Sequence, residues 1–249
     1  LNWASGLGKI SVKANADTVK EAVHAKGFKV DGIGLCRTEH MFFEKHSLQI
    51  MQKILLSSDK NDKISFISNL SKIQQLEFEK IFKIMRFKTV TIRLLDLPVH
   101  EFLPNSINEL EILADELKMT FLQVSERCKQ MAEINPMLGK RGVRLGIILP
   151  ELYKMQVKAI IKASISVYGK NQKEFPPEIM LPMVSSFKEV NLLKKLIDDV
   201  VAEITKEFNF PVNYKLGVMV ETPRAALKAG ELAVISSFLS FGTNDLTQM

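Results

Sequence analysis

Short apolar, β-rich runs alternate along the chain with longer segments in which apolar residues recur every three or four positions. Alternation of this kind is typical of an α/β protein whose mainly parallel sheet is covered by helices. The short runs predict seven strands, at residues 9–14, 32–36, 89–95, 142–146, 178–183, 214–220 and 238–241. The longer segments predict helices at residues 46–56, 71–86, 151–166 and 187–206.

One connection is much longer than the others. Residues 96–140 carry a helical pattern of their own, from about 107 to 132, and we interpret them as a helical insert after the third strand. No repeat or flexible linker divides the chain, so we expect one domain over residues 1–249. The simplest architecture is a (β/α)₈ TIM-type barrel of which seven strands are visible, with the sequence ending before the eighth.

Composition places the chain among ordinary globular proteins, because 46% of its residues are hydrophobic and 25% are charged. No apolar run approaches the length of a membrane span, and the first residues lack the layout of a signal peptide. Two cysteines, Cys36 and Cys128, are too few for a disulfide framework in 249 residues. We therefore expect a cytoplasmic protein, or an organellar one after processing, with no membrane partner.

The net charge of +6 reflects 34 basic against 28 acidic residues and raises the question of an anionic partner. The lysines are scattered over the predicted helices, as on solvated surfaces, and no nucleic-acid-binding motif is present, so we expect no nucleic acid partner. Most of the seven arginines, in contrast, flank short apolar runs: Arg37, Arg93, Arg141, Arg144 and Arg224.

In a barrel, the loops after the carboxyl ends of the strands form the active face. Arg37, Arg93 and Arg141 lie at such positions, and three converging guanidinium groups would bind a phosphate through paired hydrogen bonds. The alternative is that these arginines form structural ion pairs at the rim with nearby carboxylates: Asp17, Glu39 and Asp96.

Glu221 and Asp245 follow two successive strands, so their carboxylates would lie side by side. Two carboxylates suit Mg²⁺, which leaves its other positions to water and substrate. A salt bridge from Glu221 to Arg224 or to a lysine is the alternative. The segment Gly242-Thr243-Asn244 offers a glycine loop whose backbone N–H groups could approach an anion.

Eight sequence blocks, in order along nearly the whole chain, carry a family resemblance. They are ANADT at 14–18, GIGLCRTEHMFF at 32–43, VTIRLLDLPVHEFLP at 90–104, NPMLGKRGVRLG at 135–146, PELYKMQVKAI at 150–160, EIMLPMV at 178–184, VETPRAAL at 220–227 and SFGTNDLTQM at 240–249. With these blocks the chain resembles the family of enzymes that use phosphoenolpyruvate (PEP). Within the family, CRTEHMFF and HEFLP look most like the dikinases that interconvert pyruvate and PEP.

The resemblance implies a PEP/pyruvate-binding barrel in which Arg37, Arg93 and Arg141 hold the phosphoryl group, with Arg144 an open alternative to Arg141. It implies that Glu221 and Asp245 hold Mg²⁺ and that the loop of Gly242, Thr243 and Asn244, with Asp245, meets the substrate. In such an enzyme a phosphohistidine on another domain exchanges its phosphoryl group with pyruvate enolate. An ATP-grasp domain completes the cycle, so that the full enzyme interconverts PEP, AMP and pyrophosphate with pyruvate, ATP and phosphate. A homodimer is also implied.

Some features depart from the family pattern. The catalytic cysteine of the family falls beyond Met249, so we expect no catalytic residue within the chain and an inactive isolated domain. Lys140 stands where the dikinases commonly have histidine, and Leu97 where they commonly have proline. The alternatives are the barrel of a PEP-protein phosphotransferase or PEP synthase, or a barrel that only binds or dimerises.

Overall fold

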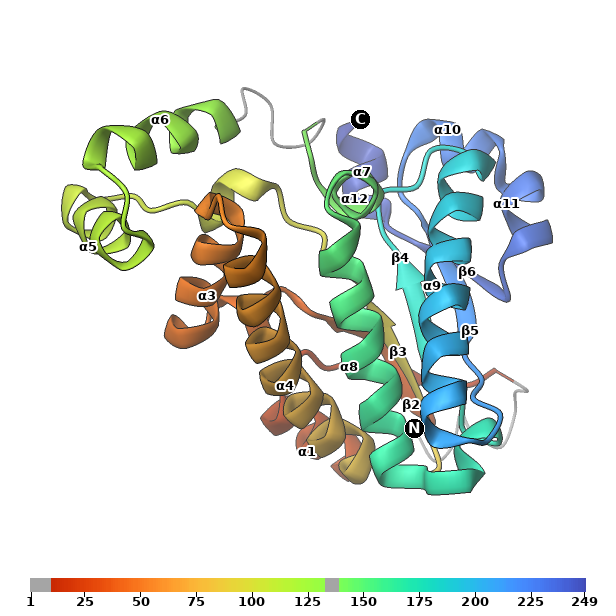
Figure 1. Cartoon of the computed structure of the whole chain (residues 1–249). Helices are drawn as coiled ribbons and strands as arrows, with labels where there is room; N and C mark the ends of the chain where they lie inside the picture. The colour runs from red at the N-terminus through yellow and green to blue at the C-terminus, as the bar shows by residue number, and fades with distance from the viewer. Residues whose placement is uncertain (1–9, 133–138) are drawn as a thin grey trace.

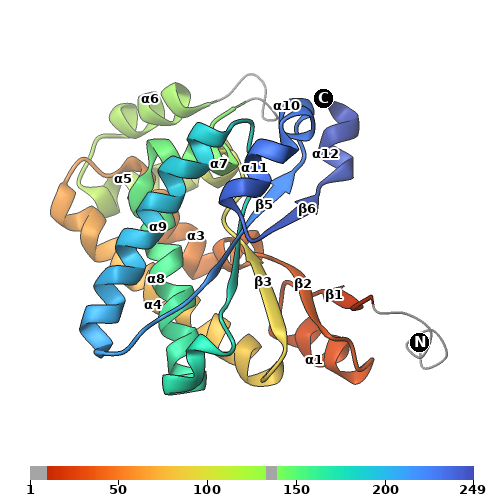
Figure 2. The ribbon, with the colours of Figure 1, turned by 90° about the vertical axis from the view of Figure 1, so that its right-hand side faces the viewer.

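The computed structural model of the protein describes residues 10–132 and 139–249, and its strands form a single curled sheet (Figures 1 and 2). The six strands of these residues are β1 (Lys13–Asn15), β2 (Gly32–Arg37), β3 (Thr89–Arg93), β4 (Glu178–Leu181), β5 (Lys215–Val220) and β6 (Phe238–Phe241). Their order in the sheet is their order along the chain, and every neighbouring pair is parallel. The sheet is therefore an all-parallel half-barrel flanked by helices.

The predicted strand at residues 142–146 is wrong, because these residues begin helix α7 (Gly142–Ile148). Gly142 has a φ of +55°, in the left-handed region, and a Cβ atom on it would lie 2.7 Å from Met183 Cβ. The alternating Val143 and Leu145 are both buried, which looks like a strand in sequence, but the apolar run continues to Leu149 and buries one side of a helix instead.

As a result, β3 pairs directly with β4, with Arg93 opposite Met180. The connection between them consists of a 3₁₀ helix, η2 (Val99–Phe102), and helices α5 (Ile107–Leu117), α6 (Phe121–Met131), α7 and α8 (Pro150–Tyr168). The single helical pattern predicted over 107–132 is divided into α5 and α6. Lys118 takes a left-handed conformation after α5, and Thr120 caps α6 through a hydrogen bond from the backbone N–H of Gln123.

The predicted helices flanking the sheet are confirmed. The remaining helices are α1 (Val19–Gly27), α2 (Glu39–Phe43), α3 (Lys45–Leu56), α4 (Lys60–Ile84), η3 (Gly169–Lys173), α9 (Phe187–Phe208), α10 (Pro223–Leu227), α11 (Ala229–Ile235) and α12 (Thr243–Gln248). Helices α4, α8 and α9 stand side by side against one face of the sheet (Figure 1). Among the described residues, no helix combines the length and apolarity that a membrane crossing requires.

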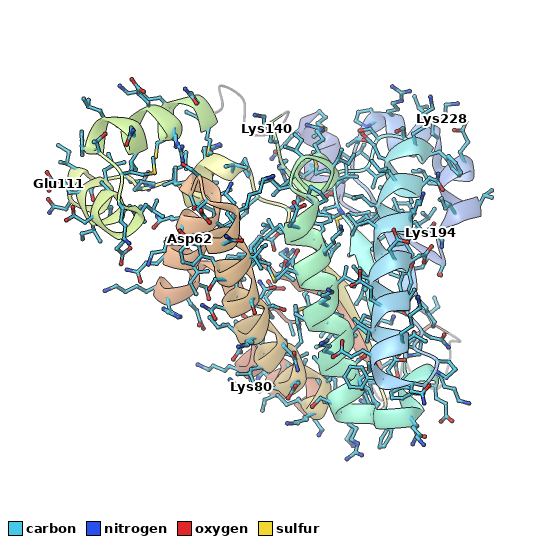
Figure 3. All side chains as sticks on the ribbon, in the orientation of Figure 1. Asp62, Lys80, Glu111, Lys140, Lys194 and Lys228 are labelled. Carbon is cyan, nitrogen blue, oxygen red and sulfur yellow. The ribbon has the colours of Figure 1, made fainter. Side chains whose placement is uncertain are left out.

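Charged side chains are spread over the outer surface of these helices. Lys80 on α4, Lys194 on α9 and Lys228 beside α11 lie on separate parts of the molecule (Figure 3). The lysines therefore do not form one basic stripe on this face. Lys9 of the first predicted strand and residues 135–138 of the sequence block at 135–146 lie outside the described residues.

A buried glutamate joins four strands near their amino ends. Glu178, at the start of β4, accepts a hydrogen bond of 2.6 Å from Thr91 of β3 and pairs with Lys13 of β1 at 3.2 Å. Lys215 of β5 lies 3.7 Å from its other carboxylate oxygen. Because both oxygens have partners, this end of the sheet buries a carboxylate without leaving it unpaired.

Strands β1 and β6 are the outer strands of the described sheet, each paired on one side only. Phe241 of β6 is 70% exposed. Unpaired parallel edges with apolar side chains favour pairing with another chain. We therefore expect the 249-residue chain, expressed alone, to associate in size-exclusion chromatography with light scattering, and Phe241→Lys to reduce this association.

The matched control for this edge is Phe87→Lys, which changes another exposed phenylalanine, 59% exposed and just before β3 rather than on an outer strand. It should leave the association unchanged. A monodisperse monomer at every concentration would contradict the expectation, as would equal effects of the two substitutions.

Candidate active site

The carboxyl ends of the strands gather the arginines singled out from the sequence. Arg37 ends β2 and Arg93 ends β3, and the two residues are paired in the sheet register. Arg141 lies just before α7, in the long connection, yet its guanidinium group reaches the same place because it bonds to Asp96, three residues beyond Arg93. Parallel strands place all their carboxyl ends at one edge, and this edge is where the groups converge.

Arg93 is held on two sides by carboxylates. Its Nη2 donates to Glu39 Oε1 at 3.0 Å, and its Nη1 lies 3.3 Å from Asp96 Oδ2. Burial alone lowers the pKa of Arg93, but Glu39 and Asp96 more than offset this, so the pKa lies above its usual value. Arg93 is therefore a permanently charged group, only 9% exposed, with its Nε lacking a hydrogen-bond partner in the described structure.

Arg141 forms the second part of this network. Its Nε and Nη2 donate to the two oxygens of Asp96 at 3.1 and 2.8 Å, in a bidentate pair. Its Nη1 lies 3.5 Å from Asp245 Oδ1. Arg144 instead donates to the carbonyl of Gly139. The geometry thus favours Arg141 over Arg144 as the third arginine of the cluster.

Arg37 is the most open of the three arginines, with its side chain 40% exposed. Its Nη1 lies 3.2 Å from Asp17 Oδ2, and its backbone N–H donates to the other oxygen of Asp17 at 2.7 Å. His40 Nε2 is 3.7 Å from the same carboxylate. The rim ion pairs considered from the sequence are therefore present. Asp96 pairs with both Arg93 and Arg141 and so links these two arginines.

Glu221 follows β5 and is fully buried. Its Oε1 accepts a 2.6 Å hydrogen bond from the backbone N–H of Met183, whereas its Oε2 has no hydrogen-bond partner in the described structure. Burial, with Asp96 as a nearby negative charge, raises the pKa of Glu221 from 4.5 to about 7. The pair with Arg224 considered from the sequence does not form, because Arg224 lines a cavity elsewhere.

The segment after β6 packs tightly against Glu221. A Cβ atom on Gly242 would lie 2.5 Å from Glu221 Oε2, so only glycine fits without displacing the carboxylate. Thr243, Asn244 and Asp245 form the first turn of α12, so the expected glycine loop is shorter than predicted and consists of Gly242 alone. The helical turn brings the Asp245 carboxylate toward Arg141.

The cluster has an excess of negative charge. Five carboxylates (Asp17, Glu39, Asp96, Glu221 and Asp245) accompany three guanidinium groups (Arg37, Arg93 and Arg141). In the described structure, the buried arginine and carboxylate side chains that retain an unpartnered atom all lie here: Arg93, Glu39 and Glu221. Unpartnered charged atoms are costly unless a ligand completes them, and the charge excess suits a cation.

A family model described as the PEP-binding domain of PEP-utilising enzymes matches residues 1–249. The chain belongs to this family. It is 40% identical over 248 residues to the pyruvate, phosphate dikinase of Rickettsia prowazekii and 41% identical over 248 residues to that of Giardia intestinalis. The dikinase of Clostridium symbiosum is 38% identical over 247 residues. The alignments cover 99–100% of the chain, which spans about 28% of the length of these relatives.

Several residues that shape the arginine and carboxylate cluster were not singled out from the sequence. Tyr153 and Gln156 of α8 reach the segment after β3, where Tyr153 donates to the carbonyl of Leu95 at 2.9 Å and Gln156 accepts from its N–H at 3.0 Å. Thr222 donates to the carbonyl of Val184 at 2.8 Å. For Tyr153 and Gln156 the signal in the sequence was weak, because polar residues within an amphipathic helix look like part of its solvent-exposed face.

Neither cysteine belongs to the site. Cys36 is fully buried on β2, and burial raises the pKa of its thiol, as is typical of a small core residue. Cys128 lies on α6, in the connection that follows β3. Burial also raises its pKa. The thiols of this chain are thus protonated at neutral pH.

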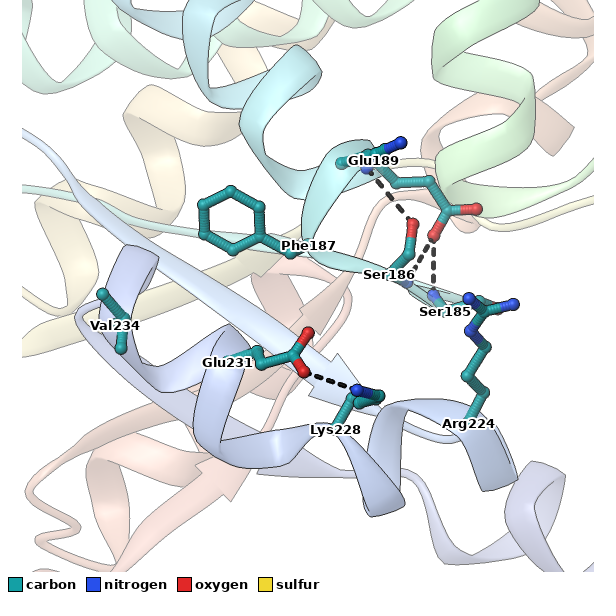
Figure 4. Close-up of a pocket in the computed structure, with 9 residues that line it drawn as sticks. Ser185, Ser186, Phe187, Glu189, Arg224, Lys228, Glu231 and Val234 are labelled. Carbon is teal, nitrogen blue, oxygen red and sulfur yellow. Dashed lines mark hydrogen bonds and ion pairs between the residues drawn. The ribbon is translucent and has the colours of Figure 1, made fainter.

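A cavity of about 600 Å³ is lined by none of the three arginines of the cluster (Figure 4). The start of α9 and helices α10 and α11 form its walls, with Ser186 and Arg224 on facing sides. Glu189 there accepts hydrogen bonds from the backbone N–H groups of Ser185 and Ser186 at 2.7 and 2.8 Å. These three groups therefore already satisfy one another.

Proposed function

We propose that residues 1–249 form the PEP/pyruvate-binding domain of a pyruvate, phosphate dikinase, as part of a (β/α)₈ TIM-type barrel. The observation that carries this proposal is the convergence of Arg37, Arg93 and Arg141 with two carboxylates, Glu221 and Asp245, at the carboxyl ends of the strands. The similarity to dikinases supports the choice of enzyme. In the complete enzyme the domain would exchange a phosphoryl group between a phosphohistidine domain and pyruvate, in a cycle with ATP.

The arginines bind and orient the phosphoryl group. Guanidinium groups from two paired strand ends and from the long connection belong to one edge of the sheet, and their planar sets of N–H donors suit the oxygens of a phosphoryl group in transfer. Arg93 and Arg141 are already positioned by carboxylates, so little side-chain freedom is lost on binding.

The two remaining carboxylates suit Mg²⁺. The unpartnered Oε2 of buried Glu221, the nearby Asp245 and the excess negative charge fit a hard divalent cation, which prefers carboxylate oxygens. No group of three or more metal-binding side chains is present among the described residues, so water and substrate would complete the coordination. When bound, Mg²⁺ supplies positive charge that stabilises negative charge on the substrate oxygen.

Glu221→Gln and Asp245→Asn should each weaken Mn²⁺ binding in the presence of PEP by about tenfold or more, since each removes one of two charged ligands. Paramagnetic relaxation of water protons measures this affinity directly. Glu178→Gln, a buried glutamate at the opposite end of the sheet, should leave it unchanged. Unchanged Mn²⁺ affinity in both site variants would rule out the metal assignment.

The choice of enzyme is tested on the full-length protein. A dikinase consumes PEP only with AMP and pyrophosphate, whereas a PEP-protein phosphotransferase transfers the phosphoryl group to a carrier protein without a nucleotide. We expect repeated turnover of PEP to pyruvate to require both AMP and pyrophosphate, although one equivalent of pyruvate per enzyme can form without them. Turnover with a carrier protein alone would favour the phosphotransferase, and the absence of PEP binding would leave a barrel that serves only as an interaction module.

A further inference from the structure

Glu39 connects two strand ends of the arginine cluster through one oxygen atom. Its Oε1 accepts a 3.0 Å hydrogen bond from Arg93 Nη2 and a 2.9 Å hydrogen bond from the backbone N–H of Asp96. Glu39 begins α2, directly after β2, whereas both donors belong to the end of β3 and the residues that follow it. The carboxylate is only 8% exposed, so water weakens these bonds little.

The residue before Glu39 holds the same arginine by its backbone. Thr38 is fully buried, and its Oγ1 donates to the carbonyl of Arg93 at 3.1 Å. Two successive residues at the start of α2, Thr38 and Glu39, thus hold the main chain and the guanidinium group of Arg93. Such double attachment restricts the direction in which the guanidinium group points.

Helix α2, which begins at Glu39, is held in place by aromatic contacts. Phe42, on the same short helix, is fully buried, and its ring lies 5.9 Å from that of Phe102 in η2. Phe43 stacks on Phe102 at 5.6 Å. Since η2 follows Asp96 by only a few residues, these rings fix α2 relative to the segment that Glu39 bonds.

The effect of Glu39 extends to a second arginine. Glu39 fixes the backbone of Asp96, and the Asp96 side chain holds Arg141 in a bidentate pair and also contacts Arg93. A change at Glu39 therefore alters both guanidinium groups.

We propose that Glu39 is a positioning residue that orients Arg93, and through Asp96 also Arg141, toward the phosphoryl group of PEP. The inference rests on the proposed function. It predicts selectivity: PEP carries a phosphoryl group and pyruvate does not, so loss of this positioning weakens PEP binding much more than pyruvate binding. A purely structural role would weaken both ligands alike or neither.

The test measures PEP and pyruvate affinities of the full-length protein by calorimetry in the presence of Mg²⁺. Glu39→Gln keeps the size of the side chain but removes the negative charge that accepts both hydrogen bonds, and we expect about tenfold weaker PEP binding with pyruvate affinity within about twofold. Glu178→Gln is the matched control, since Glu178 is also buried and ion-paired but lies at the other end of the sheet. It should leave both affinities unchanged.

Thr38→Val gives a second variant that keeps the charge, and we expect a smaller, about threefold, loss of PEP affinity because a neutral hydrogen bond is lost. If Glu39→Gln fails to fold, this variant decides the question. Unchanged PEP affinity, or equal losses for PEP and pyruvate, would overturn the positioning role while leaving the proposed function intact. Absence of PEP binding to the unaltered protein would instead overturn the proposed function.

Discussion

Arg93→Ala is expected to slow the pyruvate half-reaction of the full-length enzyme by about 10³-fold, because it removes a buried, pre-positioned cation from the phosphoryl group. Arg93→Lys should restore little of this rate. A lysine ammonium is a point charge that cannot bridge Glu39, Asp96 and the substrate with a planar fork. Single-turnover measurement of pyruvate formation from PEP separates this effect from the nucleotide steps.

Alanine at position 93 also leaves Glu39 and Asp96 without one of their cations, which destabilises the fold by about 3 kcal/mol or more. Arg37→Ala provides the cleaner control for catalysis, since that side chain is 40% exposed and its loss disturbs packing less. This substitution too should raise the activation free energy by several kcal/mol, so that the rate falls on the order of 10²-fold or more. Turnover near the unaltered rate in Arg93→Lys would refute the proposed contact with the phosphoryl group.

Glu221→Gln is expected to stabilise the metal-free protein at pH 8 by about 3 kcal/mol, although it damages the proposed metal site. The pKa of Glu221 is about 7 in the folded protein against 4.5 for an ordinary glutamate. The folded state therefore binds the proton more tightly than the unfolded state. The contribution of Glu221 to stability is greatest below pH 4.5, falls as the pH rises from 4.5 to 7, and levels off above 7.

Glutamine is neutral throughout this range, so the advantage of the variant should appear between pH 4.5 and 7 and vanish at pH 4.5. Denaturant titrations in the presence of a chelator measure the free energy of unfolding at each pH. Glu178→Gln should have the opposite sign at pH 8, because Glu178 has both of its oxygens paired with Thr91 and lysines. Equal stability of Glu221→Gln and the unaltered protein at pH 8 would contradict the burial argument.

The alternation of short apolar runs with longer segments of helical periodicity was sufficient to predict six strands and the helices against the sheet, because the central strands are buried on both faces and the helices bury one face each. The prediction failed at residues 142–146, where alternation over five residues fits a strand and a short helix equally well. The left-handed conformation of Gly142 and its contact with Met183 decided between them, and both depend on a residue distant in sequence. The division of the insert at Lys118 likewise depends on one backbone conformation.

The positions of the site residues were more predictable than their contacts. Arg37 and Arg93 were placed correctly at strand ends, since a parallel sheet fixes which end carries the loops. Arg141 reaches the same edge through its pair with Asp96, although the predicted strand that follows it is a helix. The orientation by Glu39, the hydrogen bond from Met183 to Glu221 and the support from Tyr153 were not predicted, because each joins segments that only the folded chain brings together.

The two ends of the sheet differ in how completely their buried charges are satisfied. Glu178 ties β1, β3, β4 and β5 at one end with no oxygen left over, whereas Glu221 and Arg93 at the other end retain unpartnered atoms. The amino ends of the strands are thus the end of the sheet at which the buried charges hold neighbouring strands together. Slow amide exchange should concentrate there, and ligand-induced rearrangement should stay within the loops at the opposite end, so the domain can reorganise around each substrate without losing strand register.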